Sequence, residues 1–174
     1  MMDFKKILED LRLLLKFGND HMWKDKQVEC LQNALNNKDI LAVLPTGYGK
    51  SAIFQSLPFI KSAQVNGHLS SDKCEHIVVV VTPLNSIMLN QITKLAQMGI
   101  RACSLEFSGK SGEAIEEDQQ TCKVSLNNIK QGMYNIVYAH PESLLSAAGR
   151  DLMKAIRPMV CYLVVDEAHM IVEW

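Results

Sequence analysis

The sequence carries almost no excess of either charge. It has 18 Lys and Arg residues against 19 Asp and Glu residues, a formal net charge of −1. A broad basic field is excluded, so any nucleic-acid partner has to be held by local donors. No apolar run approaches the roughly 20 residues that span a membrane. The opening MMDFKKILEDLRLLLKF mixes charges into apolar residues and has no small-residue cleavage site, so it is not predicted to be a signal peptide.

The sequence also lacks a cysteine framework. Its five cysteines are odd in number, widely scattered and include no CxxC pair. This pattern argues against both a disulfide framework and a zinc site, and it favours reduced thiols inside a cell. The cysteines are Cys30, Cys74, Cys103, Cys122 and Cys161.

Apolar residues are present in two helical stretches and five short runs of strand formers. The helical stretches cover residues 4–15, behind Asp3 as candidate cap, and 28–35. The runs are DILAVL (39–44), HIVVVVT (76–82), RACSL (101–105), NIVYA (135–139) and CYLVVD (161–166). Helix-length segments between the runs predict an α/β fold, with a parallel sheet flanked by helices. The polar stretch 107–121 interrupts the alternation and is predicted to be a solvated loop or insertion.

The octapeptide LPTGYGKS, residues 44–51, matches the phosphate-binding pattern GxxxxGK(S/T) except that Leu44 replaces the first glycine. A predicted strand precedes it and a predicted helix follows, whose N-terminus would present N–H groups to phosphates. Lys50 would reach the β and γ phosphates, and Ser51 would bind magnesium. The candidate nucleotide-binding residues of the loop are Thr46, Gly47, Tyr48, Gly49, Lys50 and Ser51. The alternative is an ordinary strand-to-helix turn with an exposed lysine.

The hexapeptide VVDEAH, residues 164–169, ends the last predicted strand. Asp166 is predicted to hold magnesium, partly through water, and Glu167 to orient and deprotonate an attacking water. His169 is predicted to act catalytically by coupling or hydrogen bonding, because magnesium prefers oxygen ligands. The alternative is a charged helix start. Two such motifs in this order, each at a strand end, favour the nucleotide site.

Together these residues resemble the nucleotide site of superfamily 2 helicases, where the first position of the loop is often not glycine. FGNDHMWKDKQ (17–27) is similar to motif 0 of the RecQ family, TPLNSIMLNQ (82–91) to its motif Ia, and NIVYAHPESLL (135–145) to its strand and PE turn. The resemblance implies a RecA-like P-loop NTPase domain at residues 39–174. An N-terminal helical segment at residues 1–38 would carry motif 0. ATP and magnesium are the implied cofactors.

Within motif 0, the resemblance assigns Gln27 to the adenine edge, which an amide can contact as donor and acceptor together. Lys24 takes the place of the family's arginine and is the second candidate for binding the cofactor. Asn19 stands where an aromatic residue usually follows FG, and the segment is one residue longer than in the family. Without the resemblance, Gln27 would be interpreted as a solvated helix residue.

DNA contacts are expected on the loops that follow the strands. The candidates are Thr82 and Ser86 of motif Ia and His140 of the PE turn, which can hydrogen-bond the phosphates of a single strand without reading its sequence. The alternative for the TPL segment is that it only caps the following helix.

The resemblance implies the ATP-binding part of a 3′ to 5′ DNA helicase acting in recombination and repair, nuclear if the source is eukaryotic. The implied partners are single-stranded or forked DNA and a second RecA-like domain, which the chain lacks. The motif III strand, expected between the strand before Lys50 and the strand before Asp166, is also missing. The sequence therefore predicts an incomplete domain with a gap in its sheet. Two other functions remain: a different superfamily 2 RNA helicase or translocase, and a non-catalytic ATP-gated DNA-binding module.

Overall fold

The computed structural model describes residues 3–18, 22–69, 76–105 and 126–169. The chain divides into two compact units, Met1–Cys74 and Glu75–Trp174. No helix of the described residues is both long and apolar enough to cross a membrane. The predicted polar loop at 107–121 lies outside the described residues.

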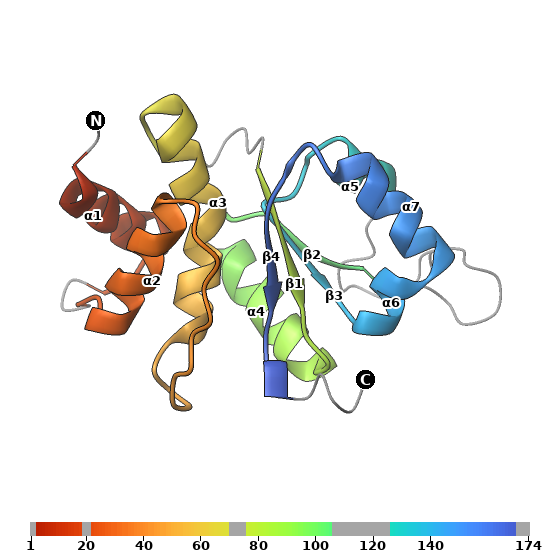
Figure 1. Ribbon diagram of the computed structural model, residues 1–174, viewed down its shortest axis with the longest axis horizontal. Coiled ribbons are helices and arrows are strands. Elements are labelled where there is room, and N and C mark those ends of the chain that lie inside the picture. Colours follow the sequence, from red (N-terminus) through yellow and green to blue (C-terminus); the bar gives the residue numbers. More distant parts are fainter. Residues whose placement is uncertain (1–2, 19–21, 70–75, 106–125, 170–174) are drawn as a thin grey trace. The chain divides into compact units, whose positions relative to one another are not determined.

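The first unit consists of three helices, α1 (Phe4–Leu14), α2 (Asp25–Leu35) and α3 (Lys50–Asn66) (Figure 1). The predicted cap of α1 is confirmed, because the Asp3 carboxylate accepts a hydrogen bond of 3.1 Å from the Lys5 N–H. Both α1 and α2 pack against α3. Residues 52–60 of α3 are all buried, including the polar side chains of Gln55 and Ser56.

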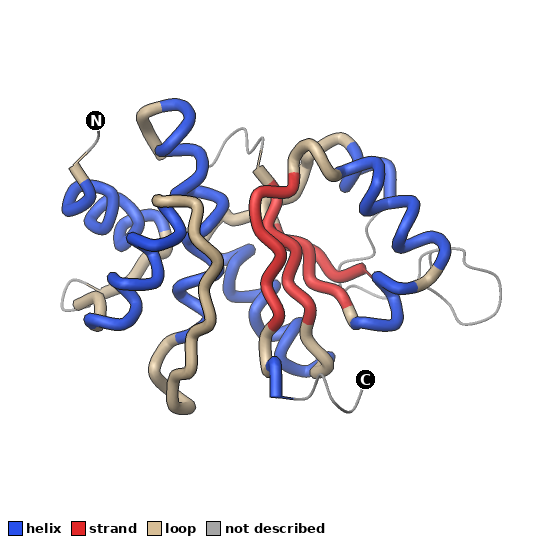
Figure 2. The backbone as a smooth tube through the Cα atoms, in the orientation of Figure 1, coloured by secondary structure: helices blue, strands red, loops and turns tan. Residues whose placement is uncertain are grey.

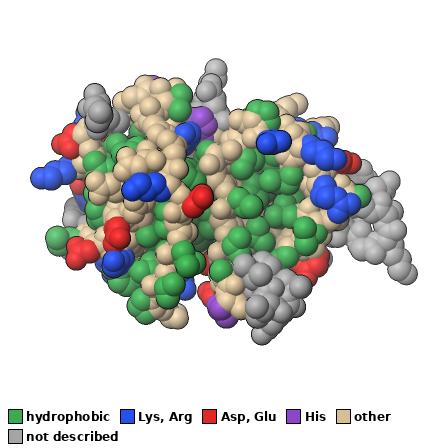
Figure 3. Space-filling model, viewed as in Figure 1, with side chains coloured by type: hydrophobic (Ala, Val, Ile, Leu, Met, Phe, Trp, Pro, Cys, Tyr) green, Lys and Arg blue, Asp and Glu red, His purple; other side chains and the backbone are tan. Residues whose placement is uncertain are grey.

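The prediction of a β-strand at residues 39–44 is wrong for this structure. The segment belongs to no sheet, and it leaves Leu41 86% and Val43 88% exposed. A β-strand exists only through hydrogen bonds to a neighbouring strand, and no described strand pairs with this segment. Its β-forming composition therefore cannot produce a ladder. On the face of the molecule drawn in Figure 3, hydrophobic side chains lie at the surface among polar ones.

The second unit contains a four-stranded parallel sheet with the order β2-β3-β1-β4 (Figure 2). Its strands are β1 (Ile77–Val81), β2 (Ala102–Leu105), β3 (Ile136–Ala139) and β4 (Val160–Val165). All four strands predicted after residue 75 are thus confirmed. The central strand β1 is buried along its whole length, whereas the edge strand β4 leaves Leu163 60% and Val165 38% exposed.

The helices of this unit are α4 (Asn85–Gln97), α5 (Leu126–Lys130), α6 (Pro141–Leu145) and α7 (Ala147–Ile156). One face of the sheet packs on α5 and α7, where Val79 and Val137 share a buried cluster with Leu152. On the other face, the Tyr138 hydroxyl donates to Gln91 Oε1 of α4 at 2.9 Å. Helices therefore cover both faces, as expected for a parallel sheet.

Candidate nucleotide site

The loop at residues 44–51 has the backbone geometry of a phosphate-binding turn. Gly47 has φ 76° and Gly49 has φ 95°, both in the left-handed region that favours glycine. The helix α3 begins at Lys50, with Gly49 as its N-cap residue and no side-chain cap. The predicted helix start at the lysine is confirmed. An uncapped helix N-terminus that follows a glycine turn is suited to bind an anion.

Gln27 of α2 lies against this loop and is only 1% exposed. Its Nε2 donates to the Gly49 carbonyl at 3.0 Å and to the Tyr48 carbonyl at 3.3 Å. Its Oε1 accepts from the Lys24 N–H at 2.9 Å, which is the reciprocal half of a capping box. Both ends of the amide are therefore bonded, and they join the first turn of α2 to the phosphate loop.

Lys24 and Tyr48 make a second connection between α2 and the loop. The Lys24 ammonium lies 4.7 Å from the centre of the Tyr48 ring, a cation–π contact, and it also donates to the Gly47 carbonyl at 3.4 Å. The Tyr48 hydroxyl accepts from the Lys26 N–H at 3.4 Å. Motif 0 and the phosphate loop therefore form one hydrogen-bonded structure in this chain.

These contacts bear on the adenine role predicted for Gln27. To contact a base, the amide has to exchange its bonds to the loop carbonyls for bonds to the base edge. The adenine contact thus stays a prediction. Sequence reasoning missed the loop-anchoring role of Gln27. The available signal was the glutamine three residues after Lys24, the spacing of a capping box.

We expect Gln27→Glu to lower the free energy of unfolding by about 2 kcal/mol, because the introduced carboxylate would face two carbonyl oxygens while buried. Urea unfolding at neutral pH would measure this loss. The loss should shrink as the pH falls, because a protonated carboxyl group can donate again. The control is Gln32→Glu, at an exposed position of the same helix. Equal stability of the two variants would contradict the anchoring role.

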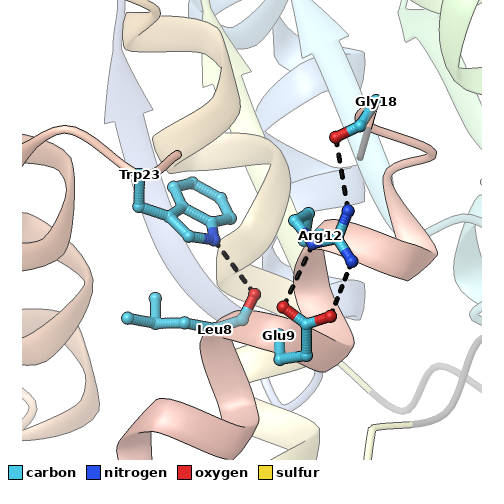
Figure 4. A network of polar contacts seen from close by, with 5 residues as sticks. All are labelled: Leu8, Glu9, Arg12, Gly18 and Trp23. Carbon is cyan, nitrogen blue, oxygen red and sulfur yellow. Dashed lines mark hydrogen bonds and ion pairs between the residues drawn. The ribbon is translucent and has the colours of Figure 1, made fainter. Parts of the chain in front are cut away.

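The first part of motif 0 is fixed to α1 by polar contacts (Figure 4). The Trp23 indole donates to the Leu8 carbonyl at 2.9 Å, and the Arg12 guanidinium donates to the Gly18 carbonyl at 3.3 Å. Arg12 also pairs with Glu9 at 2.6 Å, and this hydrogen bond lowers the pKa of the Glu9 carboxyl. The indole N–H of Trp23 therefore holds this part of motif 0 against α1.

The DEAH segment follows β4 in a tight turn. The Asp166 N–H donates to the Val81 carbonyl of β1 at 2.8 Å, and Asp166 Oδ1 accepts from the Glu167 N–H at 3.1 Å. Glu167 has φ 53°, an uncommon backbone conformation for a residue with a side chain. His169 Nδ1 lies 3.4 Å from Glu167 Oε2, so these two predicted catalytic side chains are neighbours. Burial raises the pKa of Tyr162 in β4 to about 12.

The predicted DNA-contact residues differ in exposure. Thr82 is 1% exposed, whereas the His140 side chain is 23% exposed and lies 3.8 Å from the Glu142 carboxylate. The alternative was that the TPL segment caps the next helix, but Thr82 does not cap it. Leu84 is the N-cap residue of α4, and no side chain caps that helix. The side chain of Ser86 lies outside what the structure describes.

The predicted magnesium ligands belong to separate units, with Ser51 in the first and Asp166 in the second. No group of three or more His, Cys, Asp or Glu side chains that could hold a metal occurs within the described ranges. Magnesium binding therefore remains a prediction from the oxygen chemistry of these two residues.

Residues 24–174 match the family model described as DEAD/DEAH box helicase. The chain belongs to the DEAD/DEAH box helicase family. It is 29% identical over 168 residues to the ATP-dependent helicase wrn-1 of Caenorhabditis elegans, covering 95% of this chain and 14% of that protein.

Two bacterial members of this helicase family are equally similar, and both are named ATP-dependent DNA helicase RecQ. The one from Synechocystis is 30% identical over 174 residues, covering 100% of this chain and 31% of that protein. The one from Haemophilus influenzae is 30% identical over 148 residues, covering 85% of this chain and 20% of that protein. The chain thus spans less than a third of the length of these relatives.

Proposed function

We propose that this chain is the ATP-binding part of a RecQ-like DNA helicase, which couples ATP hydrolysis to 3′ to 5′ movement on DNA. The observation that carries the proposal is the phosphate loop. Two left-handed glycines lead into an uncapped helix that starts at Lys50. The names of the relatives, ATP-dependent DNA helicase RecQ and ATP-dependent helicase wrn-1, support ATP as the nucleotide and DNA as the substrate.

Each residue of the site has a proposed task. Lys50 binds the β and γ phosphates, and the backbone of the loop surrounds them. Ser51 and Asp166 offer only oxygen atoms, the ligands that magnesium prefers, and the metal would neutralise charge on the phosphates. Glu167 takes a proton from the attacking water, with His169 beside it.

The proposed partners are single-stranded or forked DNA and a second RecA-like domain. Such a domain would supply an arginine to the transferring phosphate, as the RecQ resemblance implies. We further propose an intracellular location, nuclear if the source is eukaryotic, and a role in recombination and repair.

Nucleotide binding to the 174-residue chain tests the first half of the proposal. We expect Lys50→Ala to weaken binding of magnesium ATP by about tenfold or more in calorimetry, because it removes a charge from the phosphate site. Lys61→Ala is the matched control on the same helix, since the Lys61 ammonium bonds Asn37 and Gln64 instead. Equal affinity of wild type and Lys50→Ala would contradict the phosphate-binding role.

Hydrolysis tests the second half, and it is measured in a chain extended through a second RecA-like domain, with saturating single-stranded DNA. Glu167→Gln is expected to keep ATP binding and to lose turnover, because the amide cannot accept the water's proton. Undiminished turnover in this variant would contradict the proposed role of Glu167 in taking a proton from the attacking water. Stronger stimulation by single-stranded RNA than by DNA would favour an RNA helicase. Binding of ATP without any turnover would favour a non-catalytic module.

A further inference from the structure

Three polar residues lie side by side at the carboxyl end of the sheet. The register pairs Val81 of β1 with Ala139 of β3 and with Val165 of β4. The next residue on each strand is polar: Thr82 after β1, His140 after β3 and Asp166 after β4. Hydrogen bonds continue the ladder one step on both sides, since the Thr82 N–H donates to the Ala139 carbonyl at 3.1 Å and the Asp166 N–H donates to the Val81 carbonyl at 2.8 Å.

The three residues also fall on the same face of the sheet by register. Side chains alternate along a strand, and laterally paired residues of parallel strands share a face. Two residues earlier, Val80 pairs with Tyr138 on one side and with Val164 on the other. The Tyr138 hydroxyl bonds Gln91 of α4, which identifies this face as the one that α4 covers.

The central member of this row has an unsatisfied hydroxyl. Thr82 is 1% exposed, and its Oγ1 has no hydrogen-bond partner in the described part of the chain. Leaving a buried hydroxyl unpaired costs about 1–3 kcal/mol, which is why native proteins rarely do so. Valine has nearly the same shape and would avoid this cost. The stability of the ligand-free chain therefore does not explain why threonine occupies this position.

We propose that Thr82 is a positioning residue that connects the DNA-facing turn at His140 to the magnesium-binding carboxylate of Asp166. This rests on the proposed nucleotide and DNA binding. With both ligands bound, the Thr82 hydroxyl donates to the Asp166 carboxylate and accepts a hydrogen bond from the His140 ring. The carboxylate is then held in one orientation toward the metal. Thr82 is too buried to contact DNA itself. The direct DNA contact predicted for it from the sequence is therefore replaced by an indirect one through His140.

The first test needs no ligand. Thr82→Val removes an unpaired donor and keeps the shape, so the urea midpoint of the chain is expected to stay the same or to rise. The matched change is Thr93→Val, where the hydroxyl already donates to the Leu89 carbonyl at 2.9 Å. A clear fall of the midpoint in Thr82→Val would show that the hydroxyl is satisfied in the ligand-free chain, and it would overturn the proposal.

The second test measures the coupling between the two ligands. Binding of fluorescent ADP with magnesium is titrated on the 174-residue chain, with and without an oligo-dT strand. In the wild type and in Thr93→Val, the strand is expected to change the nucleotide affinity by roughly fivefold, near the low end of coupling between sites. Thr82→Val should reduce this change to less than about twofold, and Thr82→Ser should restore it, because it keeps the hydroxyl.

The outcomes separate this proposal from the proposed function. Nucleotide binding with unaltered coupling in Thr82→Val would overturn the role of Thr82 and leave the proposed function in place. The same holds if the wild type binds nucleotide and oligo-dT without any coupling between them. If the wild-type chain binds no nucleotide, the proposed function fails, and the role of Thr82 fails with it.

Discussion

Replacing Gly49 by alanine is expected to lower the free energy of unfolding by about 3 kcal/mol and to abolish tight nucleotide binding. Gly49 has φ 95°, and a left-handed conformation costs a residue with a side chain about 1–2 kcal/mol. A Cβ atom there would also stand 2.5 Å from Gln27 Nε2, so the amide would have to leave the loop carbonyls. The lost hydrogen bonds add about 1 kcal/mol each.

The matched control for this variant is Gly47→Ala. Gly47 has φ 76°, but a Cβ atom there would meet nothing within 4 Å. This variant should therefore lose only the backbone part of the energy, about 1–2 kcal/mol. The chain has 2 tryptophans, so a Trp174→Phe background leaves Trp23 as the only one, and its fluorescence reports on the first unit during urea unfolding. Equal losses in the two glycine variants would contradict the contact between Gly49 and Gln27.

Gly149→Ala is expected to destabilise the second unit by about 3 kcal/mol or more. Gly149 lies in the first turn of α7, and its N–H donates to Ser146 Oγ at 3.0 Å. A Cβ atom at this position would collide with the Ser143 carbonyl oxygen and stand 2.8 Å from that of Leu144. Both obstacles are backbone atoms of α6, which cannot move as a flexible side chain can.

Thermal unfolding followed by far-ultraviolet circular dichroism would measure this loss. Gly18→Ala serves as the control, because a Cβ atom there meets nothing within 4 Å, and we expect a change of less than about 0.5 kcal/mol. Since α6 begins directly after His140, a displaced α6 should also weaken binding of oligo-dT. A Gly149→Ala chain as stable as Gly18→Ala would show that α6 and α7 can separate at little cost.

Much of the sheet could be predicted because a buried parallel strand has a strong local signature. The run IVVVV of β1 is continuously apolar, and the structure buries every residue of it. The start of α3 at Lys50 was equally predictable, since glycines mark the positions that need positive φ. In these places the local preference and the tertiary environment agree.

The segment at residues 39–44 shows where this reasoning fails. Its β-forming composition matches that of the confirmed strands, yet Ile40, Leu41 and Val43 are exposed. Strand formation depends on a partner that can be far away in the sequence, so composition alone cannot establish it. The wrong prediction came from treating a preference for extended backbone as proof of pairing.

The anchoring contacts of Gln27 and the proposed role of Thr82 could not be predicted from the sequence, for a related reason. Sequence spacing suggests which ligand an amide or hydroxyl could reach, but it does not reveal which protein atoms lie nearer. Gln27 is bonded to loop carbonyls 21 and 22 residues further along the chain. Thr82 is enclosed by neighbouring strands that are distant in sequence. Contacts of this range require the tertiary structure.

The position of β4 at the edge of the sheet bears on the tendency of the protein to aggregate. The strand VCYLVV contains neither a charged residue nor a proline, the residues that commonly keep sheet edges from aggregating. Where nothing covers it, an edge strand of this kind can recruit an extended segment from another molecule and begin intermolecular cross-β growth. The net charge of −1 offers little colloidal repulsion against it. Solubility during expression and concentration should therefore depend mainly on whether this edge is covered.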